Sequence, residues 1–156
     1  MEKVFNNPLL IVEDSDEDYV VLERVMQQMS VKNPIYRCLD GDEALDFIFR
    51  EGLYQDRAQS PRPAVILLDL NLPGTDGREV LEQVKSNQSV TDIPVVIFTS
   101  SHNPQDVEFC YHNGANGYLI KPMGREKLTE TMQSFVDYWL NTNVPPGERI
   151  DFSQFI

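Results

Sequence analysis

A continuous apolar run over residues 64–68 ends directly at the carboxylate of Asp69, and this feature restricts the fold most strongly. A run without polar alternation is typical of a central parallel strand, because helices cover both faces of such a strand. The turn pairs Pro73-Gly74 and Asp76-Gly77 then lead into a predicted helix over 78–87. A lone acid in this place would most simply end a strand. Whether Asp69 also has a chemical role depends on the residues at the ends of the other strands.

Three further apolar runs also end in polar residues. They are 9–12, which ends at Glu13 and Asp14, 95–98, which ends at Thr99, and 117–120, which ends at Lys121. A shorter, mixed run at 35–39 is typical of a strand at the edge of a sheet. Helical periodicity lies between and after these runs, in segments that include 21–29, 41–49, 78–87, 104–113 and 128–140.

Strands that alternate with helices predict right-handed βαβ units and one parallel sheet. We therefore expect an α/β, flavodoxin-like, doubly wound sheet of five strands in the order 2-1-3-4-5, with five helices. That order brings the carboxyl ends of four strands to one edge of the sheet. We expect the polar residues at these ends to form one pocket: Glu13, Asp14, Asp69, Thr99 and Lys121.

Length and composition narrow the class of protein. The 156 residues fit one domain, and the net charge of -12 argues against a nucleic-acid partner. Cys38 and Cys110 fit no metal-ligand spacing, and no apolar run is long enough to span a membrane. We expect a cytoplasmic protein with one domain over residues 1–142, a long surface loop at 51–63 and a C-terminal extension at 143–156.

The expected pocket is suited to phosphoryl chemistry. Three carboxylates that lie close together repel one another, and a hard divalent cation relieves the repulsion. Oxygen ligands favour Mg²⁺, which often shares its coordination with a phosphate. Asp69 is then the candidate nucleophile, while Lys121 and Thr99 meet the phosphoryl oxygens. The sequence contains no glycine-rich phosphate loop of the nucleotide-binding types.

Four short motifs together resemble the receiver domain of two-component response regulators: residues 11–14, 67–77, 98–100 and 118–122. The resemblance covers about residues 8–140, and it is specific because spaced residues on four strands must all match. It implies a fold of five parallel strands and five helices. It also implies that Asp69 accepts a phosphoryl group from the phosphohistidine of a sensor kinase.

The resemblance assigns further roles by position. It implies that Asp14, Asp69 and the backbone carbonyl of Asn71 bind Mg²⁺, while Glu13 acts through a metal-bound water. The other implied residues contact the phosphoryl group, switch the conformation or tune the phosphoryl lifetime. They are Thr99 and Tyr118 as the switch pair, Ser100 and Lys121 at the phosphate, Pro122 as a cis proline, and Asn71 and Ser101 beside the acyl phosphate.

A narrower resemblance links the chain to small stand-alone receivers that serve phytochrome-type histidine kinases in cyanobacteria. It rests on the 51–63 loop, the extended tail and general similarity. The family also suggests a homodimer through the face of the fourth and fifth strands and an unidentified downstream protein. No enzyme activity is expected beyond slow self-dephosphorylation.

Other classes of function remain open at this stage. A protein-binding module of the same fold that works without phosphorylation is the main alternative, although no site residue is missing. A phosphohydrolase would carry a second acid where Asn71 stands. A DNA-binding regulator would need a longer or more basic segment after residue 140.

Overall fold

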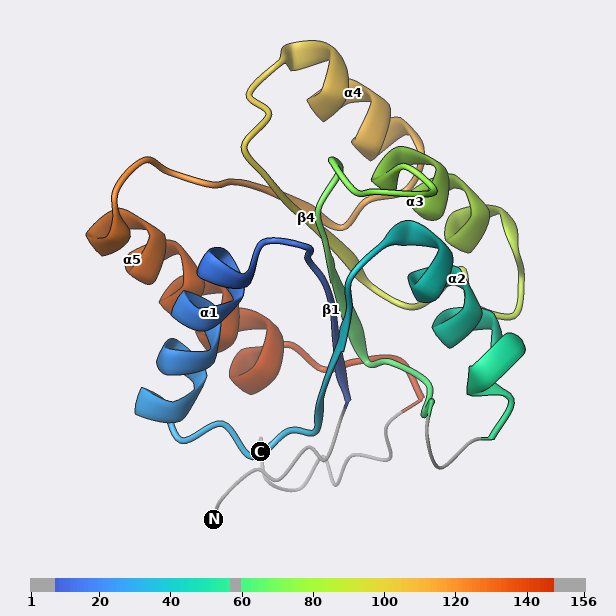
Figure 1. The fold of residues 1–156 in the computed structure, drawn as a ribbon, viewed down its shortest axis with the longest axis horizontal. Coiled ribbons are helices and arrows are strands. Elements are labelled where there is room, and N and C mark those ends of the chain that lie inside the picture. Colours follow the sequence, from blue (N-terminus) through green and yellow to red (C-terminus); the bar gives the residue numbers. More distant parts are fainter. Residues whose placement is uncertain (1–7, 57–59, 148–156) are drawn as a thin grey trace, which may run out of the picture.

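The computed structural model describes residues 8–56 and 60–147. The five strands lie in one parallel sheet in the order β2-β1-β3-β4-β5, as the sequence predicts (Figure 1). They are β1 (Leu9–Val12), β2 (Ile35–Cys38), β3 (Val65–Leu68), β4 (Val95–Thr99) and β5 (Gly117–Ile120). The mixed strand β2 forms an edge, and the fully buried strands β1, β3 and β4 lie between the edges.

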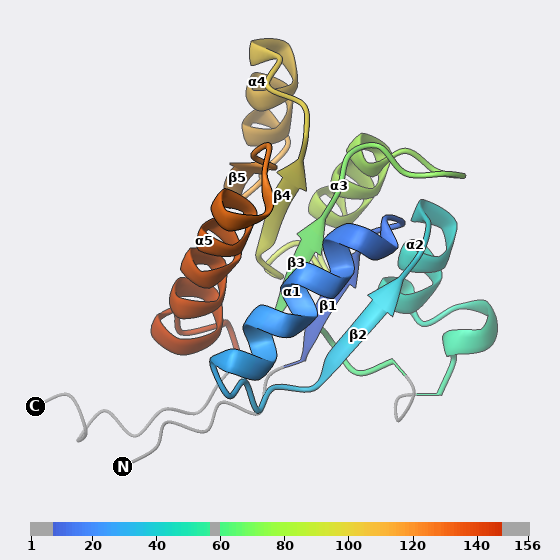
Figure 2. The same ribbon diagram turned by 60° about the vertical axis from the view of Figure 1, so that its left-hand side comes forward.

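Five α-helices cover the two faces of the sheet. They are α1 (Asp16–Gln28), α2 (Gly41–Phe49), α3 (Gly77–Ser86), α4 (Pro104–His112) and α5 (Arg125–Phe135). Helices α1 and α5 lie side by side on one face, and α2 and α3 cover the other (Figures 1 and 2). A short π-helical segment, η2 (Val136–Thr142), continues α5. The flavodoxin-like prediction is therefore confirmed.

The sheet separates two apolar cores because successive side chains of a strand point to opposite faces. In β1, Leu10 and Val12 pack toward α2 and α3, whereas Leu9 and Ile11 pack toward α1 and α5. The apolar stripe of the last helix belongs to the second core. Its buried members are Leu128, Met132, Phe135, Val136 and Leu140, and Trp139 packs against them.

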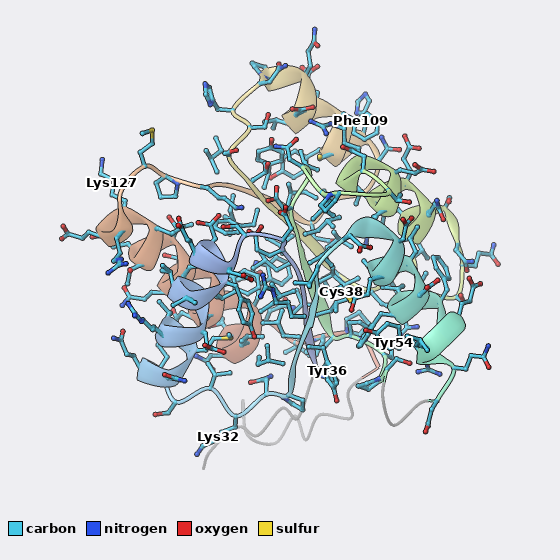
Figure 3. The ribbon with its side chains drawn as sticks, viewed as in Figure 1. Lys32, Tyr36, Cys38, Tyr54, Phe109 and Lys127 are labelled. Atoms are coloured by element: carbon cyan, nitrogen blue, oxygen red, sulfur yellow. The ribbon has the colours of Figure 1, made fainter. Side chains whose placement is uncertain are left out.

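The start of the predicted surface loop is attached to the domain. A short 3-10 helix, η1 (Gly52–Tyr54), follows α2, and the Tyr54 hydroxyl donates a hydrogen bond of 2.7 Å to Glu43. The ring of Phe47 lies 5.4 Å from that of Tyr36 and 5.1 Å from that of Tyr54, on the α2 side of the sheet (Figure 3). These contacts hold the first part of the loop against α2.

Most of the predicted C-terminal extension lies outside the described residues, which end at 147. Within residues 8–56 and 60–147, no helix has the length and apolar character needed to cross a membrane.

Candidate functional site

The carboxyl ends of β1, β3, β4 and β5 bring together the polar residues that the sequence singled out. The ladder extends past the strands, because the Asp69 amide donates to the Val12 carbonyl (3.1 Å) and the Lys121 amide donates to the Thr99 carbonyl (2.7 Å). Glu13, Asp69 and Thr99 are buried. The backbone register of the sheet therefore sets the positions of these side chains.

Three acids at this edge form a cluster that fits a divalent cation. Glu13, Asp14 and Asp69 each offer a carboxylate oxygen, and these oxygens lie within 4.8 Å of one another. Asp14 is exposed, so solvent can reach the cluster, whereas Glu13 and Asp69 are buried. A set of oxygen-only ligands with an open side suits a hard cation that keeps part of its water shell.

Lys121 neutralises part of this negative charge. Its Nζ lies 2.6 Å from Glu13 Oε1, 2.8 Å from Asp69 Oδ2 and 2.9 Å from Asp18 Oδ2. Burial disfavours the ammonium, but the hydrogen bonds to Asp69, Glu13 and Asp18 outweigh it and raise the pKa of Lys121. The Lys121 ammonium is thus held beside Asp69 Oδ2.

Burial disfavours the ionised form of Glu13. Burial raises the pKa of Glu13 to about 7, and the charge of Asp69 adds to the increase, although Lys121 opposes it. A second cation at the cluster would favour the ionised form of Glu13. The raised pKa of Glu13 is therefore consistent with a metal ion that binds beside it.

Asp18 is a member of the site that the sequence did not identify. As an acid in the first turn of α1 it is explained by the helix dipole alone, and the N-cap of that helix is Ser15, whose hydroxyl accepts from the Asp18 amide at 3.3 Å. Folding places its carboxylate 2.9 Å from Lys121 Nζ. No sequence spacing signals this contact, because it depends on how α1 packs beside the end of β5.

Arg37 of β2 was also not identified from the sequence. Its Nε donates 3.0 Å to the Glu13 carbonyl, its Nη2 lies 2.8 Å from Asp16, and its guanidinium lies 4.3 Å from the centre of the Tyr19 ring. These contacts attach the acidic loop after β1 to the edge strand. Arg37 therefore helps to hold Glu13 in place.

The predicted switch residues lie on the other side of Asp69. Thr99 is fully buried, Ser100 is exposed, and the Ser101 amide points to Thr99 Oγ1 at 3.4 Å. The Tyr118 hydroxyl donates 2.9 Å to the Ser101 carbonyl. Thr99 and Tyr118 are thus connected through Ser101.

The residues after Asp69 and Lys121 agree only in part with expectation. The Asn71 amide donates 3.2 Å to Asp69 Oδ1, so Asn71 lies beside the carboxylate. The prediction of a cis Pro122 is wrong for this structure, since the described residues contain no cis peptide bond. A prolyl bond prefers the trans form by about 0.5–1 kcal/mol, and Lys121 reaches all three carboxylates with the trans bond.

An ion pair borders the switch residues. Asp106, in the first turn of α4, accepts hydrogen bonds from Arg78 and from the Ser101 hydroxyl. Both bonds hold the pKa of Asp106 below the ordinary value of 3.8, and the bond from Arg78 has the larger effect.

Because the folded form lowers this pKa, the stabilisation by Asp106 is present above pH 3.8 and is lost as the pH falls further. Asp106→Asn is expected to lower the free energy of unfolding by about 1 kcal/mol at pH 7, since the pair is partly exposed. The difference between wild type and variant shrinks below pH 4. Urea denaturation at pH 7, 5 and 3.5 measures it, and a difference that does not change with pH would contradict the assignment.

Comparison with known proteins bears directly on this geometry. The family model described as "Response regulator receiver domain" matches residues 9–133. The chain belongs to the response-regulator receiver family. The response regulator Rcp1 of Synechocystis sp. is 39% identical over 139 residues, which are 89% of this chain and 92% of that protein. The probable methanogenesis regulatory protein FilR2 of Methanothrix harundinacea is 37% identical over 139 residues, which are 89% of this chain and 87% of that protein.

Solved structures show the same relationship. The crystal structure of the Mn²⁺-bound form of Rcp1 matches this receiver with a TM-score of 0.86 and 38% identity, over 90% of this chain and 99% of that one. The phosphorylated cyanobacterial phytochrome response regulator RcpA matches with a TM-score of 0.84 and 33% identity, over the same shares of the two chains. The narrower resemblance to phytochrome response regulators is thereby confirmed.

Proposed function

We propose that this receiver accepts a phosphoryl group on Asp69, with Mg²⁺ as the cation, from a sensor histidine kinase of the phytochrome type. The observation that carries the proposal is the group of carboxylates and one ammonium around Asp69, whose Oδ2 lies 2.8 Å from Lys121 Nζ. Support also comes from RcpA, which was solved in phosphorylated form, and from Rcp1, which was solved with Mn²⁺.

In this mechanism an oxygen of Asp69 attacks the phosphorus atom of a phosphohistidine. The bond between phosphorus and the imidazole nitrogen breaks, the nitrogen keeps the electron pair, and an acyl phosphate forms on Asp69. Lys121 and the hydroxyl of Thr99 are placed to meet charge on the phosphoryl oxygens. Mg²⁺, held by Asp14, Asp69 and the Asn71 carbonyl, with Glu13 acting through a water, would supply additional positive charge at the same oxygens.

The phosphoryl group would leave slowly by hydrolysis, with Asn71 and Ser101 beside it, so the protein acts as a switch and not as an enzyme that turns over a substrate. We also propose that the receiver acts in the cytoplasm. We further propose a homodimer through the face of β4 and β5, and a downstream protein that recognises the phosphorylated form. The phosphate-independent binding module is not favoured, because the acids, the hydroxyl and the lysine of the site are all present.

Incubation with acetyl phosphate tests the proposal without knowledge of the kinase. Intact mass spectrometry is expected to show one added phosphoryl group on the wild type with Mg²⁺, and none with EDTA. Asp69→Asn keeps the size of the side chain and removes the nucleophile, so it should gain no mass. Gel filtration of the same samples shows whether phosphorylation changes the oligomeric state.

The controls separate a specific adduct from chemical modification of the surface. Asp92→Asn removes an acid that lies remote from the site and pairs with Arg62, and it should be phosphorylated like the wild type. A wild type that gains no mass with Mg²⁺, or an Asp69→Asn variant that gains as much, would contradict the proposed phosphoacceptor.

A further inference from the structure

Arg37 is a charged side chain on the inner part of the edge strand β2. Side chains of a strand alternate between its two faces, and Ile35 packs toward α1 and α5, whereas Tyr36 and Cys38 pack toward α2 and α3. Arg37 therefore lies on the α1 side of the sheet. Its side chain is only 18% exposed, and solvent does not reach its Nη2 atom. A guanidinium held largely out of water is costly, so its contacts must compensate for the lost hydration.

The contacts of Arg37 converge on the acidic loop between β1 and α1. Its Nε donates a hydrogen bond of 3.0 Å to the Glu13 carbonyl, and its Nη2 lies 2.8 Å from Asp16 Oδ1. The guanidinium carbon lies 4.3 Å from the centre of the Tyr19 ring. Glu13 directly follows β1 and Asp16 is the first residue of α1, so one guanidinium holds both ends of the loop. A planar guanidinium that makes several contacts at once fixes orientation as well as distance.

The hydrogen bond to the Glu13 carbonyl also affects Asp14. The peptide group that joins the two residues is planar, so fixing the carbonyl fixes the plane from which Asp14 continues. The Glu13 amide donates to the Cys38 carbonyl at 3.1 Å, so β2 holds the backbone of Glu13 on both sides. Asp69 is held separately, at the end of β3. The orientation of residues 13 and 14 therefore determines whether their carboxylate oxygens come within 4.8 Å of that of Asp69, as they do here.

We propose that Arg37 is a positioning residue for the divalent-cation site: it orients the acidic loop so that Glu13 and Asp14 converge with Asp69. Arg37 contacts the carbonyl of Glu13, so it acts through the backbone of the loop. It lies on β2, outside the four motifs that resemble receiver domains. The inference rests on the proposed function, because it assumes that a cation binds at this cluster.

Arg37 has two effects on cation affinity, and they have opposite signs. Its positive charge repels a second cation, but Asp16 pairs with that charge and is itself 86% exposed, so counter-charge and solvent both weaken the repulsion. Its positioning effect strengthens binding, and outer groups that orient metal ligands typically change metal affinity by about 10–100-fold. We therefore expect positioning to outweigh repulsion, so that removal of Arg37 weakens cation binding even though it removes a positive charge.

The experiment compares Arg37→Met with wild type in equilibrium titrations with Mg²⁺ alone, followed by isothermal calorimetry without any phosphoryl donor. Methionine keeps an unbranched apolar stem beside Tyr19 and removes the charge and all the donors. We expect the Kd for Mg²⁺ to rise by about tenfold, the lower end of the range for groups that orient metal ligands. Urea denaturation with EDTA shows that the variant is folded. A purely structural role would lower the stability of the folded protein and leave the Kd unchanged.

Two further variants show whether the effect belongs to this arginine. Arg37→Lys keeps the charge and a donor but lacks the planar fork, so its Kd should rise by only about threefold. Arg62→Met is the matched control, because Arg62 likewise binds a backbone carbonyl, that of Ser89, and a carboxylate, that of Asp92. Arg62 precedes β3, at the edge of the sheet opposite the acidic cluster, and its removal should leave the Kd unchanged.

A Kd for Mg²⁺ that is unchanged or lower in Arg37→Met would overturn the inference. If that variant does not fold, Arg37→Lys decides the question, and a Kd equal to that of wild type would overturn it. An equal rise in Arg62→Met would do the same, because general destabilisation would then explain the result. Failure of the proposed function looks different: the wild type itself would bind no Mg²⁺, and the inference would fail with it.

Discussion

Replacement of Lys121 with methionine is expected to lower the free energy of unfolding by about 3 kcal/mol at pH 7 without metal, because it leaves buried carboxylates unpaired. Lys121 Nζ contacts Glu13, Asp69 and Asp18 at 2.6–2.9 Å, and the first two of these acids are buried. Methionine is one atom shorter than lysine but keeps a similar unbranched apolar stem. The loss therefore reports on the charge and not on packing.

Addition of Mg²⁺ should restore much of this loss. A cation bound at the acidic cluster replaces part of the missing positive charge, and a ligand that binds only the folded form stabilises it by mass action. Mg²⁺ should stabilise Lys121→Met more than wild type, since in the wild type the ammonium already occupies the oxygens of Glu13 and Asp69. Urea denaturation with EDTA and with Mg²⁺ measures both quantities.

Lys127→Met is the matched control for this substitution. Lys127 is exposed in the first turn of α5 (Figure 3), so its removal should change stability by less than about 0.5 kcal/mol, with or without metal. If Lys121→Met costs no more than Lys127→Met, the contacts of Lys121 do not stabilise the folded receiver.

Gly77→Ala is expected to cost about 3 kcal/mol or more of unfolding free energy, because the added methyl group has no space. A Cβ at this position would lie 2.1 Å from the Asp69 carbonyl oxygen and 2.6 Å from the Leu70 Cα. Both are backbone atoms at the end of β3 and cannot rotate away. Relief of the contact must displace either the start of α3 or the segment that carries Asp69.

Gly117→Ala separates this steric effect from the ordinary effect of a glycine substitution. A Cβ at Gly117 would meet Val96 and Trp139 at 3.6–3.9 Å, which is normal van der Waals contact. We expect a change below about 1 kcal/mol there, in either direction. Thermal and urea denaturation of the two variants should differ clearly, and equal losses would show that the Gly77 contact is easily relieved.

The strands, their order and the edge that carries the site could be predicted from the sequence. Uninterrupted apolar runs are required wherever helices cover both faces of a parallel sheet, and this chain has three runs of that kind in β1, β3 and β4. The carboxyl ends of parallel strands share one edge, so Glu13, Asp69, Thr99 and Lys121 had to meet once the order was set. The motifs that resemble receiver domains point to the same residues as the site.

Only the tertiary structure decided which further side chains complete the site. Asp18 contacts Lys121 across 103 positions of sequence, and Arg78 binds Asp106 across 28, with no pattern that relates either pair. The trans bond before Pro122 likewise differed from the expectation. Hydrophobic periodicity reports which face of an element is buried, whereas contacts between polar side chains depend on the packing of helix termini and loops. The sequence thus determined the sheet and its functional edge, and the packing of the helices determined the ion pairs around it.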